Sequence, residues 1–305
     1  MLEEVTLVTG ANFVLMTESS AASSRSHGMK PTRILLFVVA ALGLLLGTLP
    51  GAGTAGAVTT WAPASTATIH PGVQTLTEGA QCTANFIFQD GTNVYIGQAA
   101  HCSGTGAATD TNGCTAASLP LGTAVEVDGA SHPGTLVYNS WLTMQANGET
   151  DADTCQYNDL ALVKLDPADV AKVNPSVPKW GGPVAVGGAT AQGDDVYSYG
   201  NSSLRLGITQ LSPKKGISLG TDAGGWNHTV YTVTPGIPGD SGSGFLDANG
   251  NAIGVLSTVA IAPLALSNGV GDLGHELAYL HAHVSSFASV QLVPGTQPFT
   301  PGLPL

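Results

Sequence analysis

The sequence has 305 residues, of which only 10% are charged and 6% are aromatic, and it contains 40 glycines. Its net charge of −12 argues against binding to nucleic acids or anionic membranes, because both attract clusters of Lys and Arg. A chain of this length forms one compact unit or two small, closely packed lobes, and few charges with many glycines favour a turn-rich β protein.

The N-terminal segment, residues 1–57, is predicted to direct export. Two basic residues precede the apolar run 34–46, and small residues ending at Ala57 follow it, which is the pattern of a cleavable secretory signal peptide. A membrane-spanning helix needs about 20 apolar residues, so this shorter run predicts no stable membrane anchor. Met29 is itself a suitable start for such a signal, so either the protein begins there or the acidic, Ser-rich residues before it are a long dispensable leader.

Short β-type segments follow an arm or short propeptide at 58–78, which shows no periodicity. A tight hairpin is predicted at Asp90-Gly91 and a second at Asn249-Gly250, because such pairs supply the positive φ angles of these turns. Strand-like runs occupy 84–88, 93–97, 124–127, 135–138, 160–165, 184–186, 196–199, 229–233 and 253–256. Closely spaced short strands with many glycines and prolines indicate an antiparallel sandwich or barrel.

A stretch with three prolines and two glycines, 167–182, is the natural linker between two halves, so we expect a first β unit at 79–170 and a second at 171–290. One helix is predicted, at 273–286, with Asp272 as its N-cap. One face of that helix carries the apolar side chains Leu273, Leu277, Leu280 and Val284. The tail 291–305 contains four prolines and is expected to be irregular.

The strongest chemical signal is the glycine-rich segment 235–244, Pro-Gly-Ile-Pro-Gly-Asp-Ser-Gly-Ser-Gly. A serine hydroxyl becomes a useful nucleophile only when a base removes its proton and donors stabilise the oxyanion that forms. Glycines on both sides of Ser241 permit a sharp turn that points amide N–H groups at one place. The same residue types also build ordinary turns, so this motif alone does not decide between the two.

Two further signals precede Ser241. His101, in Gln-Ala-Ala-His-Cys at 98–102, follows a strand-like run and is anchored by the adjacent cysteine, whereas a lone histidine is usually structural. Asp159, in Asn-Asp-Leu-Ala-Leu-Val at 158–163, stands directly before an apolar strand, and buried carboxylates are rare unless they are paired. The alternative for Asp159 is a surface residue that caps the strand.

The exported part of the chain holds four cysteines, namely Cys82, Cys102, Cys114 and Cys155. An even number in an exported protein predicts two disulfides, with three possible pairings. None of the cysteines has the C-x-x-C spacing of a zinc or redox site. His281-Ala-His283 fits an exposed helix end better than a metal site, because no partner motif such as H-E-x-x-H exists. We therefore expect no metal and no cofactor.

Taken together, AAHC, D-L-A-L and G-D-S-G-S-G, in the order His, Asp, Ser, resemble the chymotrypsin-like (trypsin-fold) serine peptidases, and among them the secreted bacterial members. The resemblance covers roughly residues 79–283. It implies an all-β fold of two packed six-stranded antiparallel β-barrels with one C-terminal helix. It also implies hydrolysis of polypeptide substrates through an acyl-enzyme, without a cofactor, by a secreted monomer.

Site roles follow from the same resemblance. Ser241 corresponds to the nucleophile, His101 to its base and Asp159 to the acid that orients the imidazole. The oxyanion hole corresponds to the backbone N–H groups of Gly239 and Ser241, and Ser257 to the serine that hydrogen-bonds the acid and lines the substrate cleft. The resemblance also implies a Cys82–Cys102 bridge beside the histidine, with Cys114 and Cys155 paired to each other.

Two departures from the family bear on activation and specificity. No Ile-Val-Gly-Gly tetrapeptide precedes the first cysteine, so Asp240 needs another partner or a set of backbone donors. Pro235 occupies the position at which trypsin-type members carry a pocket aspartate, and Thr258 and Val259 replace the usual Trp-Gly of the pocket wall. A basic side chain would then enter the pocket unpaired, which is costly, so we expect a preference for small or apolar residues.

Two other functions are compatible with parts of the pattern. A non-catalytic secreted binding protein on the same fold would need none of the three motifs. An esterase of the α/β type would show G-x-S-x-G and the order Ser, acid, His. Here both His101 and Asp159 precede Ser241, and the segment 239–243 lacks that spacing.

Overall fold

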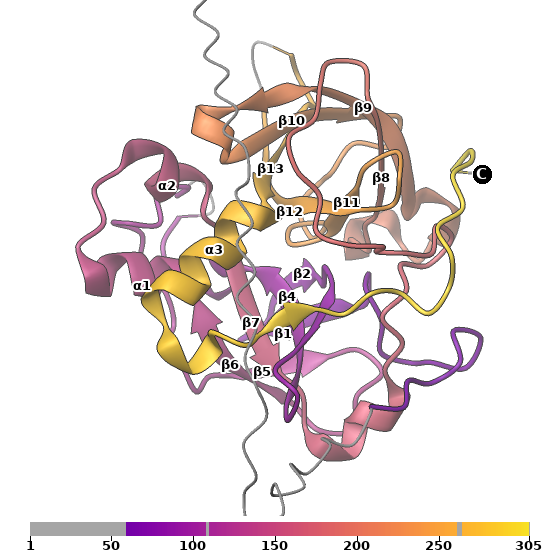
Figure 1. The fold of residues 1–305 in the computed structure, drawn as a ribbon, viewed down its shortest axis with the longest axis horizontal. Helices are drawn as coiled ribbons and strands as arrows, with labels where there is room; N and C mark the ends of the chain where they lie inside the picture. Colours follow the sequence, from indigo (N-terminus) through magenta and orange to yellow (C-terminus); the bar gives the residue numbers. More distant parts are fainter. Residues whose placement is uncertain (1–58, 108–109, 261–263, 305) are drawn as a thin grey trace, which may run out of the picture. The chain divides into compact units, whose positions relative to one another are not determined.

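The computed structural model describes residues 59–107, 110–260 and 264–304 (Figure 1). The predicted leader and signal peptide, residues 1–57, lies outside these ranges. Within them, no helix has the length and apolar character needed to cross a membrane.

Eight antiparallel strands form an N-terminal sheet in the order β14-β3-β4-β7-β6-β5-β1-β2. They are β1 (Gln74–Thr77), β2 (Ala80–Thr83), β3 (Ile87–Gln89), β4 (Val94–Ala99), β5 (Ala124–Val127), β6 (Gly134–Asn139), β7 (Leu160–Lys164) and β14 (Gln291–Leu292). Two edge strands bring the number above the six expected: β2 folds back on β1, and β14 from the C-terminal tail pairs with β3. The predicted Asp90-Gly91 turn joins β3 to β4, with Gly91 at a φ of 86°.

The remaining six strands close into a C-terminal barrel in the order β10-β13-β12-β11-β8-β9. They are β8 (Asp195–Tyr199), β9 (Pro213–Asp222), β10 (Asn227–Thr232), β11 (Gly244–Leu246), β12 (Ala252–Val259) and β13 (Asn268–Asp272). Their inward side chains form a small apolar core that includes Val196, Val230 and Phe245. Another apolar cluster combines Phe88 and Leu160 of the N-terminal sheet with Leu246 and Val255 of the barrel, and so packs the two parts together.

The all-β prediction is confirmed, but some elements differ from those expected. The apolar run 184–186 does not form a strand: Val186 makes only an isolated bridge to Ala252, and Val184 is exposed. The sequences of β9 and β13 contain glycine and polar residues and were not expected as strands. Barrel closure pairs both of them on two sides, so tertiary hydrogen bonds outweigh their weak local preference.

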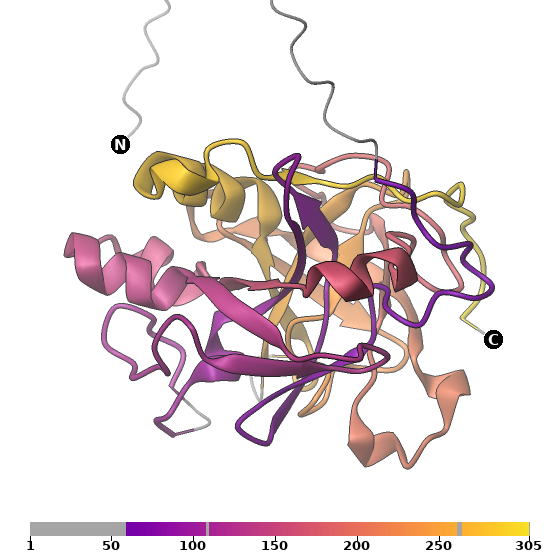
Figure 2. The same ribbon diagram turned by 90° about the horizontal axis from the view of Figure 1, so that it is seen from below.

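The expected C-terminal helix is α3 (Leu273–His283), whose first turn is capped by the Asp272 side chain accepting the His275 N–H at 2.8 Å. It lies next to α1 and β12 (Figure 2). Two helices that had not been expected are α1 (Ser140–Asn147) and α2 (Ala152–Tyr157), each too short to show a helical period. Short 3-10 turns occupy Ala100–Ser103, Pro167–Lys172, Ser203–Arg205, Thr209–Leu211, Ala223–Gly225 and Ser285–Phe287. The predicted boundary between the halves, at 170–171, falls within one of these turns.

Both disulfides implied by the resemblance are present. Cys82–Cys102 joins β2 to the turn that carries His101, with a Cα–Cα distance of 6.1 Å. Cys114–Cys155 joins the loop after His101 to α2, with a Cα–Cα distance of 5.2 Å. The first bridge therefore braces the turn that carries His101, and the second braces the segment just before Asp159.

Removing the second bridge is expected to lower the free energy of unfolding. The bridged residues are 41 positions apart, so the lost constraint on the unfolded chain amounts to about 4 kcal/mol. The test is urea unfolding of a Cys114→Ala/Cys155→Ala double variant against its parent. Both proteins carry Ser241→Ala, so that no peptidase activity of the kind the motifs imply degrades the unfolded chains. Equal unfolding midpoints would contradict the prediction.

Candidate active site

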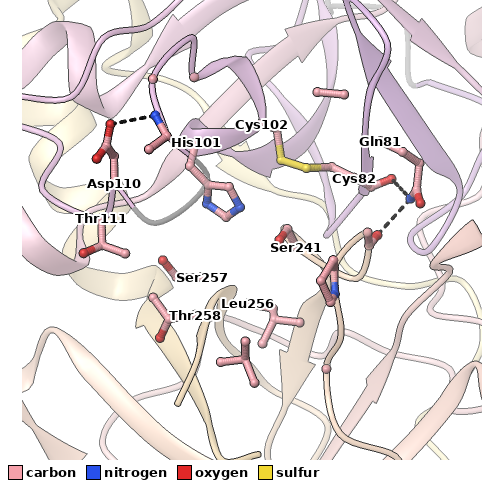
Figure 3. Close-up of a pocket in the computed structure, with 18 of the residues that line it drawn as sticks. Gln81, Cys82, His101, Cys102, Asp110, Thr111, Ser241, Leu256, Ser257 and Thr258 are labelled. Atoms are coloured by element: carbon pink, nitrogen blue, oxygen red, sulfur yellow. Dashed lines mark hydrogen bonds between the residues drawn. A yellow bond between two sulfur atoms is a disulfide. The ribbon is translucent and has the colours of Figure 1, made fainter. Parts of the chain in front are cut away.

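A cavity of about 590 Å³ opens between the N-terminal sheet and the C-terminal barrel (Figure 3). The residues predicted from the sequence that line it are Cys82, His101, Cys102, Gly239, Ser241, Ser257, Thr258 and Val259. Figure 3 shows the His101 ring directed into this cavity and Ser241 on the wall across from it. The fold thus brings together residues that are up to 158 positions apart in the sequence.

Strand pairing places His101 beside Asp159. His101 lies two residues after the end of β4 and Asp159 directly precedes β7, and these strands pair with Ala99 opposite Leu160. The Asp159 carboxylate accepts two hydrogen bonds from His101, one from ring Nδ1 at 2.6 Å and one from the backbone N–H at 2.9 Å. Asp159 is 2% exposed, so it is the buried, paired carboxylate that its sequence context suggested.

A third donor to Asp159 comes from the C-terminal barrel. The Ser257 hydroxyl, on β12, donates to Asp159 Oδ2 at 2.6 Å. The Asp159 charge also acts on the histidine. Burial by itself would lower the pKa of His101, but the negative charge of Asp159 and the hydrogen bond to it outweigh burial and raise that pKa above its ordinary value.

The turn that carries Ser241 is held against β2. The carbonyl of Ser241 accepts from the Thr83 N–H at 2.8 Å, and that of Gly239 accepts from the Gln81 side chain at 2.8 Å. Gly242 has a φ of 88°, and a Cβ there would lie 2.6 Å from the Thr83 carbonyl, so only glycine fits.

The amide groups of Gly239 and Ser241 have no protein acceptor within the described ranges. Among the described residues, no hydrogen bond joins the His101 ring to the Ser241 hydroxyl. Bonds between a base and its nucleophile are often long in a site without substrate. Both backbone N–H groups can therefore donate a hydrogen bond to a molecule bound in the cavity.

The Asp240 carboxylate pairs with two cations that were not predicted from the sequence. These are the Arg205 guanidinium and, at 3.0 Å, Lys214 Nζ, and all three groups are nearly or completely buried. Backbone N–H groups of Ser202 and Ile237 complete the set. One signal was available: three of the six basic residues after residue 57 fall at 205–215, shortly before the nucleophile motif.

The predicted specificity residues separate into two groups. Ser257, Thr258 and Val259 line the cavity, whereas Pro235 does not, and its carbonyl instead accepts from Arg205 and Lys214. Gly236, Ile237, Leu256 and Asn268 occupy this wall of the cavity.

The cavity wall near Leu256 is tightly packed. A Cβ at Gly236 would lie 2.8 Å from Leu256 Cδ2 and 2.9 Å from Asn268 Nδ2. The Asn268 amide is itself occupied, because it accepts from the Gly236 N–H at 2.8 Å and donates to the Thr258 carbonyl at 3.1 Å. This wall therefore presents mainly apolar surface to a bound side chain.

Neither histidine-containing cluster supplies a metal site. Cys82, Cys102 and His101 lie close together, but the two sulfurs are bonded to each other and offer no thiolate. His281, on α3, donates through its ring to the Val290 carbonyl at 2.8 Å.

The pair of cations on Asp240 leads to a pH prediction. Burial, with the nearby charge of Arg205, lowers the pKa of Lys214 to about 8, while Asp240 opposes that shift. An Arg205→Met variant leaves Lys214 as the sole cation, so its hydrolytic activity should fall as the pH rises through about 8 or slightly above, where Lys214 becomes neutral. The parent keeps Arg205 charged and should not show this loss. Once Lys214 is neutral in this variant, the Asp240 carboxylate is buried without a cation, which costs about 3–5 kcal/mol.

The measurement is the initial hydrolysis rate per titrated active site across this pH range. Lys215→Met is the matched control, because Lys215 pairs with Asp195 at the surface and does not contact Asp240. Parallel pH profiles for Arg205→Met and the parent would contradict the role of the two cations.

The chain is similar to a described peptidase family and to several solved structures. The family model described as a trypsin-like peptidase domain matches residues 82–255. Thermobifida fusca Protease A has 18% identity and a TM-score of 0.47, over 74% of this chain and 99% of that one. A glutamic acid specific serine protease has 16% identity and a TM-score of 0.46, over 74% and 100%. Nocardiopsis Protease has 17% identity and a TM-score of 0.43, over 73% and 98%.

A search of curated proteins returned no match. The family model, however, spans more than half of the chain and includes the segments of His101 and Ser241, which line the cavity, and of Asp159, which bonds to His101. The protein therefore belongs to the trypsin-like peptidase family and is a serine endopeptidase.

Proposed function

We propose that the protein is a secreted endopeptidase in which Ser241 attacks the peptide carbonyl, His101 acts as its base and Asp159 orients the imidazole. The observation that carries the proposal is the buried 2.6 Å contact between Asp159 and His101 Nδ1, which leaves the other ring nitrogen for Ser241 at the cavity. With Nδ1 donating to the carboxylate, Nε2 is the nitrogen able to accept a proton.

The reaction proceeds in two halves. In the first, Ser241 Oγ bonds to the carbonyl carbon, its proton moves to His101, and the C–N bond breaks as His101 passes that proton to the leaving amine. In the second, water attacks the acyl-enzyme with His101 again as base, which releases the carboxylic acid and restores Ser241. Asp159 stabilises the imidazolium that forms in each half, in line with the raised pKa of His101.

The negative oxygen that develops on the substrate carbonyl requires donors. We assign this part to the backbone N–H groups of Gly239 and Ser241, which line the cavity and donate to no acceptor in the described ranges. Donors that are already oriented cost no reorganisation during the reaction, and removing one such donor typically costs about 100- to 1000-fold in rate. Backbone donors also explain why the turn contains glycines.

The lining of the cavity supports a preference for small or apolar side chains before the scissile bond. Ile237, Leu256 and Val259 supply apolar surface there. Among the described lining residues the one carboxylate is Asp110, which lies on the other side of His101 from Ser241 (Figure 3). A basic side chain seated against Leu256 would therefore lack a counter-ion.

Secretion is supported by the signal-peptide pattern at 34–57 and by two disulfides, which persist in oxidising compartments. We further propose that the protein acts as a monomer, because one chain supplies every group of the site.

The nucleophile can be tested directly with a fluorophosphonate probe. We expect the exported protein to be labelled, Ser241→Ala to be unlabelled, and Asp159→Asn to hydrolyse peptides about 10⁴-fold more slowly because the imidazole then takes the wrong tautomer. Gel fluorescence measures labelling, and a peptide substrate measures hydrolysis. An unlabelled parent protein would favour the non-catalytic binding protein, whereas equal labelling of Ser241→Ala would assign the nucleophile elsewhere.

Substrate preference can be tested with a peptide library. Cleavage after Ala, Val or Leu should exceed cleavage after Lys or Arg by at least about 100-fold, because an unpaired buried charge costs several kcal/mol. Val259→Gly should enlarge the pocket and raise kcat/KM for Phe relative to Ala. Leu121→Gly, at an exposed apolar residue that does not line the cavity, serves as the control. Efficient cleavage after Lys or Arg would refute the assignment.

A further inference from the structure

A buried carboxyl group lies behind the site and takes no part in the cavity. Glu276, in the first turn of α3, is completely buried, and its Oε1 accepts the backbone N–H of Asp159 at 2.9 Å. The glycine at position 271 makes room for this group, since a Cβ there would lie 2.8 Å from Glu276 Oε1. Within the described ranges, Glu276 Oε2 has no hydrogen-bond partner.

The surroundings of Glu276 favour a neutral carboxyl. The titratable groups that act on it are the carboxylates of Asp159 and of Asp272, the latter at the start of α3, and Glu276 in turn contributes to the raised pKa of Tyr138 on β6. Asp272 is itself paired with His228 and His275. Burial first, and then the charges of Asp159 and Asp272, raise the pKa of Glu276 well above its ordinary value, although the bond from the Asp159 N–H opposes this.

A buried carboxyl with one unpartnered oxygen is a poor choice for stability alone. An unsatisfied buried polar atom costs free energy that an aliphatic side chain of similar size would not. A hydrogen bond to the Asp159 N–H, however, is needed at this point, because the ladder between β7 and its neighbours begins only at Leu160. A neutral carboxyl accepts that bond without placing a second negative charge beside the Asp159 carboxylate.

The polar groups of Asp159 are then held from three directions. Its N–H donates to Glu276, its C=O accepts from the Ala100 N–H at 2.7 Å, and its carboxylate bonds to His101 and Ser257. The peptide planes on both sides of Asp159 are thereby fixed, which determines where its carboxylate points.

We propose that Glu276 is a positioning residue for the reaction: as a hydrogen-bond acceptor from α3 it fixes the Asp159 backbone and so keeps the Asp159 carboxylate aligned with His101. This inference rests on the proposed roles of Asp159 and His101. It predicts that α3 contributes to kcat although no residue of the helix lines the substrate cavity.

The test compares Glu276→Leu with Glu276→Gln. The leucine variant removes the acceptor, and we expect kcat to fall by about 10- to 100-fold with KM changed less than about twofold, because a misplaced catalytic group costs rate without altering the cleft. The glutamine variant keeps an acceptor oxygen and cannot ionise, so it should recover most of the kcat that the leucine variant loses.

A second readout is the acid limb of the pH profile of kcat/KM. The charge of Asp159 raises the pKa of His101, so a misaligned carboxylate should move this limb to lower pH in Glu276→Leu and not in Glu276→Gln. A packing defect alone would lower the melting temperature but leave this limb in place. Leu280→Ala is the matched control, because Leu280 is equally buried on α3 and belongs to the apolar core.

All rates are expressed per fluorophosphonate-titrated site, so failure of the proposed function is seen separately as an unlabelled parent protein. If the parent is labelled and Glu276→Leu retains its kcat and acid limb, the inference is wrong. It is also wrong if Gln recovers nothing, or if Leu280→Ala moves the acid limb as far as Glu276→Leu does. If Glu276→Leu does not fold, Glu276→Met is measured in its place. It removes the same acceptor, so we expect the same fall in kcat and the same shift of the acid limb.

Discussion

The structure depends on the burial of one negative charge, the Asp159 carboxylate. A carboxylate in an apolar interior is costly unless donors surround it, and here the donors come from both parts of the molecule. His101 approaches through the pairing of β4 with β7, and Ser257 approaches from the C-terminal barrel. Satisfying this charge therefore requires the packed interface between the sheet and the barrel, and the same interface forms the substrate cavity.

A second buried carboxylate, Asp240, holds the turn of Ser241 as Asp159 holds His101. Arg205 and Lys214 neutralise it, and the backbone donors around it hold the turn in place. Because these cations belong to the folded barrel, no newly formed N-terminal ammonium is needed to pair with Asp240. The two halves of the site are thus each fixed by one buried charge whose partners are distant in the sequence.

Parts of the fold and much of the site were predictable from short segments of the sequence. The turn at Asp90-Gly91 and the cap at Asp272 depend on neighbouring residues only, and both occur where local rules place them. The segments around His101, Asp159 and Ser241 are likewise local patterns. The residues that were missed have no such local motif: Arg205 and Lys214 belong only to a loose group of basic residues, Glu276 is the one acidic residue within α3, and β13 is mostly glycine and polar residues.

By itself, the sequence determined the chemical class of the protein, because a nucleophilic serine needs particular flanking residues that can be read along the chain. Only the tertiary structure decided how the charges are paired and what lines the cavity. Pro235, expected in the pocket, lies instead against the cations of Asp240, and Glu276 reaches the backbone of a residue 117 positions away. Such contacts depend on which strands and helices meet in space, and no local preference of the chain encodes that.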